Sequence, residues 1–266
     1  MFCFYWSILL LLIDFSKAFD VIESKILLDK LERYDIRGLP KKWLASYLTD
    51  RSQFVTINGH DSSKQNLTYG VPQGSILGPL LFIIYINDMP SLFQAAKFIL
   101  YADDANIIIS GDNFDQVIEQ FDKLTQKLDT WVKNNGLILN FKKTNYMIFS
   151  TRRLSTESDI KINNVSIERK REARFLGVIV DEKLNWGKHI SAIRFKMCRY
   201  IGVMYKIKNR IPQRARLQIF HSFVQSHINY CSTVWGHASV TLIDSLFSQQ
   251  KKGIRAVIPG FINDRF

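Results

Sequence analysis

The sequence predicts an α+β fold: an antiparallel sheet backed by helices, followed by a basic, mainly helical region. Apolar runs at residues 8–13, 98–100 and 107–109 predict the sheet, because short apolar runs bounded by polar residues are typical of buried strands. A helical period over residues 113–135 predicts a helix on that sheet, and a basic run after residue 187 marks the last part.

The first expected strand, residues 8–13, ends on Asp14, and a turn with Asp103 and Asp104 separates the two later strands. Adjacent acids between buried strands repel each other and cost desolvation energy, so we expect a cation nearby. Carboxylate oxygens favour Mg²⁺, and two such ions support an in-line phosphoryl displacement. The alternatives to metal binding are that Asp14 is merely a polar strand end and that Asp103 and Asp104 form a solvated bend.

Between these acids we expect a helix over residues 24–34, a strand pair at 53–58 and 64–69, and a buried helix at 76–87. The loop from Gly70 to Ser75 precedes the last of these.

In that loop, Gly74 permits a close backbone approach. Gln73 offers an uncharged donor and acceptor for a nucleotide or template without competing for metal. A plain glycine and proline turn is the alternative.

The clearest helix covers residues 113–135. Asn113 and Gln116 predict a capping box at its start, and Gly136 predicts its end. A further strand is expected at residues 146–149.

The polar stretch 151–159 is the expected domain boundary. We expect a first domain at residues 1–150, a remaining sheet and hairpin segment at 151–186, and a helical basic region at 187–266. The pattern is helical from the end of the 175–180 segment to residue 258.

The net charge differs between the two parts of the chain on either side of residue 150. Residues 1–150 carry 15 Lys/Arg and 16 Asp/Glu, whereas residues 151–266 carry 21 and 8, so the excess positive charge lies in the second part. A basic surface of this kind binds phosphates by releasing counterions, although a solubilising helix face is the alternative. Nine basic residues with no acid among them occupy residues 187–216: Lys188, Arg194, Lys196, Arg199, Lys206, Lys208, Arg210, Arg214 and Arg216.

Three phrases together resemble the polymerase motifs of non-LTR (LINE-type) retrotransposon reverse transcriptases. They are the first motif (residues 13–20, IDFSKAFD), the second motif (70–79, GVPQGSILGP) and the third motif (101–104, YADD). The resemblance implies a polymerase palm followed by a thumb-like region.

Further phrases extend the resemblance over nearly the whole chain. The fourth motif (139–144, LNFKKT) precedes a phrase similar to the hairpin that grips the primer (175–178, FLGV). The C-terminal motif (230–235, YCSTVW) is similar to the region after the polymerase.

The resemblance implies a role for each matching residue. Asp14, Asp103 and Asp104 would be catalytic carboxylates and metal ligands, and Phe15, Phe19, Gln73 and Gly74 would contact the nucleotide. Phe19 would exclude a 2′-hydroxyl, and Lys143, or equally Lys142, would donate a proton to pyrophosphate. The alternative for Phe19 is an ordinary core aromatic, and the alternative for Lys142 and Lys143 is a solvated basic turn. Phe175, Leu176 and Gly177 would form the primer grip.

The implied activity is RNA-directed DNA synthesis with two Mg²⁺ ions, or Mn²⁺ as a substitute. The implied partners are an RNA template, a DNA primer and deoxynucleoside triphosphates. Since the chain starts 13 residues before Asp14, the resemblance implies missing fingers and a truncated polymerase. The alternatives are a catalytically inactive nucleic-acid-binding remnant and an RNA-templated RNA polymerase, which Phe19 disfavours.

The three cysteines show no paired spacing, so we expect no disulfide framework and an intracellular location in nucleus or cytoplasm. His221, His227, Cys231 and His237 suggest zinc, but ordinary packing fits their spacing better. Residues 1–13 lack the basic start and cleavage site of a signal peptide and are too short to span a bilayer. We therefore expect no membrane association, and the sequence leaves the oligomeric state open.

Overall fold

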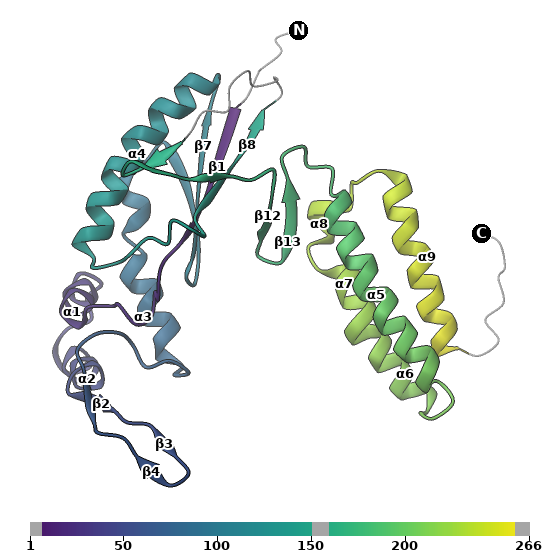
Figure 1. The fold of residues 1–266 in the computed structure, drawn as a ribbon, viewed down its shortest axis with the longest axis horizontal. Helices are drawn as coiled ribbons and strands as arrows, with labels where there is room; N and C mark the ends of the chain where they lie inside the picture. Colours follow the sequence, from purple (N-terminus) through teal and green to yellow (C-terminus); the bar gives the residue numbers. More distant parts are fainter. Residues whose placement is uncertain (1–6, 151–159, 259–266) are drawn as a thin grey trace. The chain divides into compact units, whose positions relative to one another are not determined.

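The computed structural model describes residues 7–150 and 160–258, and the chain divides into two compact units, residues 1–170 and 171–266 (Figure 1). The expected boundary at 151–159 lies outside the described residues. Because the division falls after Lys170, the expected segment 151–186 is shared between the units.

The first unit is built on a five-stranded sheet in the order β11-β8-β1-β7-β6. All pairs are antiparallel except β11 with β8, which confirms the predicted fold class. The central strand β1 is apolar on both faces, with Leu9 and Leu11 fully buried. The strands are β1 (Ser7–Asp14), β6 (Ala96–Tyr101), β7 (Asp104–Gly111), β8 (Asn145–Ser150) and β11 (Glu168–Arg169).

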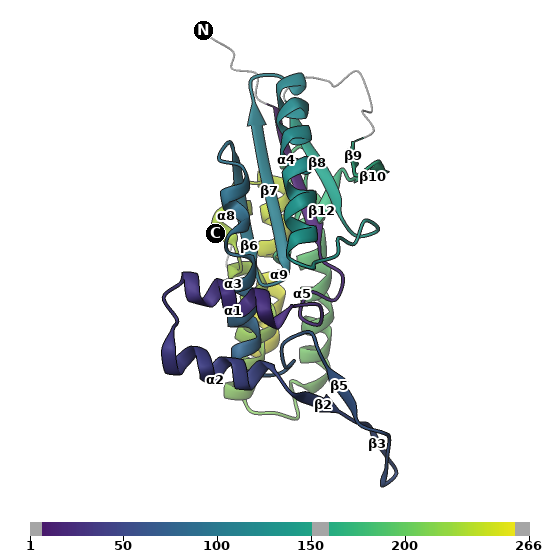
Figure 2. The same cartoon turned by 90° about the vertical axis from the view of Figure 1, so that its left-hand side faces the viewer.

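Helix α4 (Phe114–Asn134) packs on β1 and β7 and lies along the strands (Figure 2). Its start differs from the predicted capping box. The Asn113 side chain accepts a hydrogen bond from the Gln116 amide at 2.8 Å, but the Gln116 side chain accepts from Asp112, not from Asn113. The glutamine therefore caps one residue further back than predicted.

The remaining helices of the first unit are α1 (Ser24–Arg33), α2 (Gly38–Leu48), α3 (Leu77–Ile86) and the 3₁₀ turn η1 (Met89–Leu92). Helix α3 buries Leu81, Phe82 and Tyr85 but leaves Leu80 and Ile83 half exposed, so only one face of the predicted buried helix is buried.

Short strands complete the first unit. They are β2 (Arg51–Gln53) with β5 (Gln65–Leu67), β3 (Thr56–Ile57) with β4 (His60–Asp61), and β9 (Lys161–Ile162) with β10 (Val165–Ser166). The pairing of Gln53 with Gln65 agrees with the predicted strand pair of 53–58 and 64–69. The prediction is wrong for residues 56–57, which pair with 60–61 across a turn at Asn58 and Gly59, both with positive φ.

The second unit holds one hairpin and a group of helices around its own core. Helices α5 and α9 pack together. Gly253 on α9 allows the Phe220 ring at the end of α6 to approach, because a Cβ there would lie 2.8 Å from that ring. The elements are β12 (Glu172–Phe175), β13 (Val178–Asp181), α5 (Gly187–Ile207), α6 (Gln213–Phe220), the π-helical turn η2 (His221–Gln225), α7 (Ser226–Asn229), α8 (Ser232–Trp235) and α9 (Val240–Val257). Among the described residues, none of the helices has the length and apolar character needed to cross a membrane.

A buried lysine on α1 contacts helices α3 and α4 and the residue that precedes η1. The Lys30 ammonium donates to the Tyr85 carbonyl at 2.5 Å and to Asp88 at 2.8 Å, and it lies over the rings of Tyr85 and Trp131. The Trp131 indole donates to the same Asp88 oxygen at 3.2 Å. Burial lowers the pKa of Lys30 and Asp88 opposes this, while burial raises the pKa of Tyr85 to about 12. The buried charge therefore depends on Asp88.

This dependence predicts unequal effects on the two partners. Asp88→Ala leaves a buried ammonium without its counter-charge and should lower the free energy of unfolding by about 2 kcal/mol, since Asp88 is 38% exposed. Lys30→Met keeps the volume and removes the charge, so it should cost less than about 1 kcal/mol. Urea unfolding of both variants measures the difference; equal losses would contradict it.

Candidate active site

The register of the sheet brings three acids to one end of it. Asp14 closes β1 and pairs, Cα to Cα, with Asp104, the first residue of β7. The turn from β6 to β7 consists of Ala102 and Asp103, and Ala102 has φ of +50°. Strand ladder and turn thus place Asp14, Asp103 and Asp104 together, as the sequence predicted.

The fourth motif packs beside Asp14. The Asn140 amide donates to the Asp14 carbonyl at 2.9 Å, and its side chain donates to Asp14 Oδ2 at 3.0 Å. The Thr144 hydroxyl accepts from the Asp14 amide at 3.3 Å. Lys143 Nζ lies 3.9 Å from Asp14 Oδ2. Backbone and side chain of Asp14 are therefore both held from one loop.

The second motif docks on the first through Gly70. Its amide donates to the Ile22 carbonyl at 2.7 Å, its φ is +84°, and a Cβ there would lie 3.0 Å from the Asp20 backbone. The expectation that Gly74 permits a close approach stays a prediction: its φ is +79°, and a Cβ there would meet no atom of the described residues within 4 Å. The Gln73 side chain donates to Asp20 Oδ1 at 2.6 Å.

These contacts enclose a cavity of about 470 Å³. It contains six of the predicted site residues, whereas Asp104, Gly74 and Lys142 are not among the described residues that line it. The lining residues are Asp14, Phe15, Ser16, Lys17, Ala18, Phe19, Asp20, Gln73, Asp103, Asn140 and Lys143.

The aromatic residues of the first motif form part of the cavity wall. Phe15 is buried and bridges to Leu139. Phe19 is half-buried, and its ring packs against Phe82 of α3 at 4.9 Å between centroids. Phe19 therefore belongs both to the core and to the cavity, which combines the two readings of this residue.

The acids have an electrostatic cost. Burial raises the pKa of Asp104, and the charges of Asp103 and Asp14 raise it further. Within residues 7–150 and 160–258, no three carboxylate, histidine or cysteine side chains are grouped so as to hold a metal ion. The three carboxylates repel one another at this end of the sheet.

Sequence reasoning assigned no role to Asn140, Thr144 or Asp20, although each lies inside a phrase that it had singled out. Their contacts join positions 53 to 130 residues apart, and nothing in the local pattern indicates such pairs.

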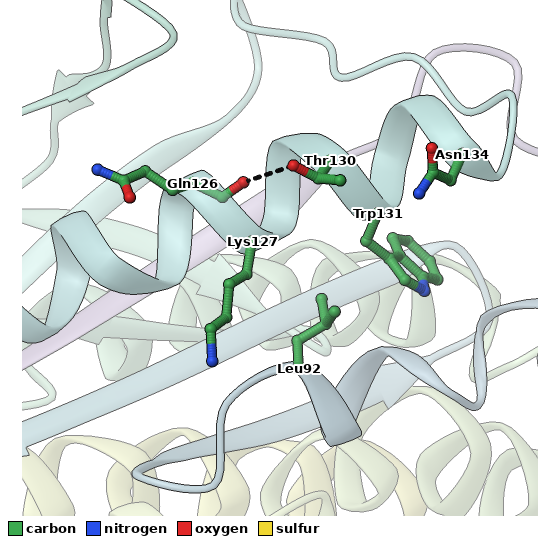
Figure 3. A pocket seen from close by; sticks show the side chains of 6 residues that line it. All are labelled: Leu92, Gln126, Lys127, Thr130, Trp131 and Asn134. Atoms are coloured by element: carbon green, nitrogen blue, oxygen red, sulfur yellow. Dashed lines mark hydrogen bonds between the residues drawn. The ribbon is translucent and has the colours of Figure 1, made fainter.

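A second cavity of about 450 Å³ lies between α4 and η1, lined by Leu92, Gln126, Lys127, Thr130, Trp131 and Asn134 (Figure 3). Thr130 donates to the Gln126 carbonyl at 3.1 Å, and Lys127 lies over the Phe93 ring. None of the residues lining it is an acid, so its chemistry differs from that of the first cavity.

In the second unit, α5 buries one face and exposes its basic residues on others. His189, Met197 and Ile201 are buried, whereas Arg194, Lys196, Arg199, Lys206 and, beyond the helix, Arg210 are exposed. Lys188 is also exposed but pairs with Glu172 on β12, and Lys208 lies over the Tyr205 ring. Arg216 is buried and does not belong to this surface.

The histidines of the second unit make ring and hydrogen-bond contacts. His237 accepts from the Trp186 indole at 3.3 Å, His227 stacks on Tyr200, and His221 contacts Phe220. These contacts agree with the packing interpretation.

Comparison with known proteins gives a consistent result. The profile of the family described as "Reverse transcriptase (RNA-dependent DNA polymerase)" matches residues 7–180. The X-element transposon RNA-directed DNA polymerase of Drosophila melanogaster is 26% identical, over 93% of this chain and 28% of that protein. The polymerase from mobile element jockey of the same species is 25% identical, over 92% and 28%. The R1 element Pol polyprotein of Bradysia coprophila is 25% identical, over 84% and 22%.

Among solved structures, telomerase from Candida albicans in complex with a fragment of telomeric RNA aligns with a TM-score of 0.49 and 12% identity, over 94% of this chain and 44% of that chain. The chain spans less than a third of the length of each of these three transposon proteins.

The raised pKa of Asp104 predicts that Asp104→Asn stabilises the protein at neutral pH without divalent metal. The folded state resists ionisation, so the gain is absent well below pH 3.8, where the carboxyl is protonated in both states, and complete above the raised pKa. Melting temperatures between pH 3 and 8 measure it. The exposed Asp122→Asn on α4 is the control, and a gain that does not grow with pH would contradict the prediction.

Proposed function

This chain belongs to the reverse transcriptase family, in the LINE-type retrotransposon class, and on that basis we propose that it is an RNA-directed DNA polymerase domain. The observation that supports the proposal best is the first cavity, where residues of all four motifs meet. Its substrates would be a primer 3′-hydroxyl and a deoxynucleoside triphosphate paired to an RNA template.

The donor set of the cavity fits Mg²⁺. Asp14 and Asp103 line it, and Asp104 adds a third carboxylate at the same sheet end. Oxygen ligands of this kind suit Mg²⁺, which supplies charge neutralisation at the attacking and leaving oxygens. Asn140 holds the Asp14 carboxylate in orientation through its 3.0 Å hydrogen bond.

Lys143 is the proposed proton donor to pyrophosphate. It lies 3.9 Å from Asp14 and lines the cavity, whereas Lys142 is not among the lining residues that the structure describes. An ammonium at this place also offsets negative charge that develops on the leaving oxygen.

Gln73 and Phe19 are the proposed nucleotide contacts. Gln73 is fixed by Asp20, and Phe19 is supported from behind by Phe82. A supported ring cannot move aside for an extra hydroxyl, so Phe19 would select deoxyribose by exclusion.

The second unit would bind the template and primer backbone. Its basic residues on and after α5 (Lys188, Arg194, Lys196, Arg199, Lys206, Lys208 and Arg210) suit phosphates. The turn at Phe175, Leu176 and Gly177 would contact the primer end.

A second candidate is a nucleic-acid-binding remnant that does not polymerise. It is favoured by the exposed basic residues on and after α5, since phosphate binding by them does not require the acids. Because the chain spans 28% of its transposon relatives, polymerisation by this segment alone is part of the proposal under test.

Primer extension separates the two candidates. With an RNA template, a DNA primer, Mg²⁺ and deoxynucleotides, we expect extension by the natural chain and a loss of at least about a hundredfold in Asp103→Ala, because a metal ligand is removed. Asp122→Ala is the control. If the natural chain binds template and primer but does not extend the primer, the remnant is the better account.

Sugar selection gives an independent test. Phe19→Ala should reduce the preference for deoxynucleotides over ribonucleotides by at least about tenfold, because the excluding ring is removed. Phe19→Tyr keeps the ring and should keep the preference. Competition between the two nucleotide types in primer extension measures the ratio, and an unchanged ratio in Phe19→Ala would assign this ring to the core alone.

A further inference from the structure

The C-terminal motif, residues 230–235, has no role in the function proposed above. It follows α7, takes φ of +53° at Cys231, and then forms the short helix α8. Trp235 is only 2% exposed, and its indole donates to the Tyr230 carbonyl at 2.9 Å. The two ends of the motif are thus tied to each other, so the segment has a fixed shape.

One end of this segment contacts the turn of the hairpin β12–β13. The Tyr230 hydroxyl donates to the Leu176 carbonyl at 2.6 Å. The Tyr230 ring lies under Gly177, where a Cβ would come within 3.3 Å of the ring. Leu176 has φ of +44°, a conformation that costs energy for a residue with a side chain, so the contact from Tyr230 offsets part of the cost of this turn.

The other end reaches the hairpin through His189. The His189 Nδ1 atom accepts a hydrogen bond from the Ile179 amide at 3.2 Å, and the imidazole packs edge-on against Trp235 at 5.8 Å. Ile179 pairs with Arg174, next to the pair Phe175 and Val178 that closes the turn. In a hairpin with a two-residue turn this next pair is not hydrogen-bonded, so the Ile179 amide points away from β12 and needs an acceptor elsewhere.

His189 must be neutral to accept the hydrogen bond from the Ile179 amide, and its surroundings favour the neutral form. The residue is 4% exposed, and burial lowers its pKa, as do the charges of Lys196 and Arg174. A neutral ring keeps a lone pair on Nδ1, whereas an imidazolium would have none to offer.

The hairpin is fixed at its far end as well. The Asp181 carboxylate accepts hydrogen bonds from the amides of Lys183, Asn185 and Trp186, which orders the connection from β13 to α5. Glu172 on β12 pairs with Lys188 on α5. The hairpin is therefore tied to the helical unit at its turn, along β13 and at its open end.

We propose that the C-terminal motif and His189 are positioning residues that hold the hairpin turn in the geometry needed to contact a primer. This rests on the proposed function, because the hairpin is the proposed primer grip. Tyr230 acts through the Leu176 carbonyl, and Trp235 acts through His189 on Ile179.

The matched variants are Tyr230→Phe and Tyr205→Phe. Both remove one tyrosine hydroxyl that donates to a backbone carbonyl of this unit, and the Tyr205 bond goes to Lys252 at 3.2 Å, on α9. In residue-resolved hydrogen exchange, we expect Tyr230→Phe to speed exchange of the amides of residues 172–181 by about fivefold, the effect of one lost hydrogen bond. Tyr205→Phe should leave them unchanged.

A second pair tests His189. His189→Asn keeps an acceptor close to the Nδ1 position, whereas His189→Phe keeps a ring for Trp235 without an acceptor. We expect faster exchange of the Ile179 amide in His189→Phe and partial rescue in His189→Asn. Acceleration throughout the unit instead of within the hairpin would show a merely structural role and overturn the proposal.

Binding of a template and primer duplex completes the test without requiring turnover. Tyr230→Phe should weaken binding of a duplex with a recessed primer end at least about threefold relative to Tyr205→Phe, with less effect on a blunt duplex. Equal binding by the two variants, or no duplex binding by the natural chain, would overturn the proposal. If the exchange and binding effects are observed but the natural chain does not extend a primer, the proposed polymerase activity is wrong and the positioning role stands.

Discussion

The backbone ladder between β1 and β7 is the constraint on which the proposed active site depends. It pairs Asp14 with Asp104 and thereby fixes where the acids meet. Side chains alternate along a strand, so a slip of one residue would turn Asp14 to the opposite face and bury a charge among leucines. The charge of Asp14 opposes that alternative, because it would move to the face on which Leu9 and Leu11 are fully buried. Core packing and the placement of the acids are thus one property of the same strand.

The acids and the basic residues occupy different units of the chain. Burial and the charges of the neighbouring carboxylates raise the pKa of Asp104 and oppose folding. The ion pair of buried Lys30 with the partly exposed Asp88 and the core around α4 stabilise the same unit. The second unit carries most of the excess positive charge on an exposed surface. A polyanionic substrate would relieve both imbalances, since its metal ions neutralise the acids and its phosphates neutralise the basic residues.

Much of the fold could be predicted from the sequence because local patterns determine it. The strands ending at Asp14 and Tyr101, the helix beginning at Phe114 and the turn at Gly136 all follow from periodicity and turn residues. Helix α2 was missed, because Gly38 and Pro40 stand in its first turn and leave a weak pattern. The roles of Asn140 and Gly70 were also missed. Both depend on contacts between segments distant in sequence, which only the folded chain brings together.

The contacts of the hairpin β12–β13 determine where recombination could divide this chain without breaking a folded unit. The family match runs to residue 180, yet the chain divides after Lys170, and the hairpin is bonded to Tyr230, His189 and α5. Recombination at the end of the matched family segment would separate the hairpin from its supports. A junction near residue 170 would transfer the hairpin and its helices intact, so the structure is compatible with exchange of this unit between related elements at that point.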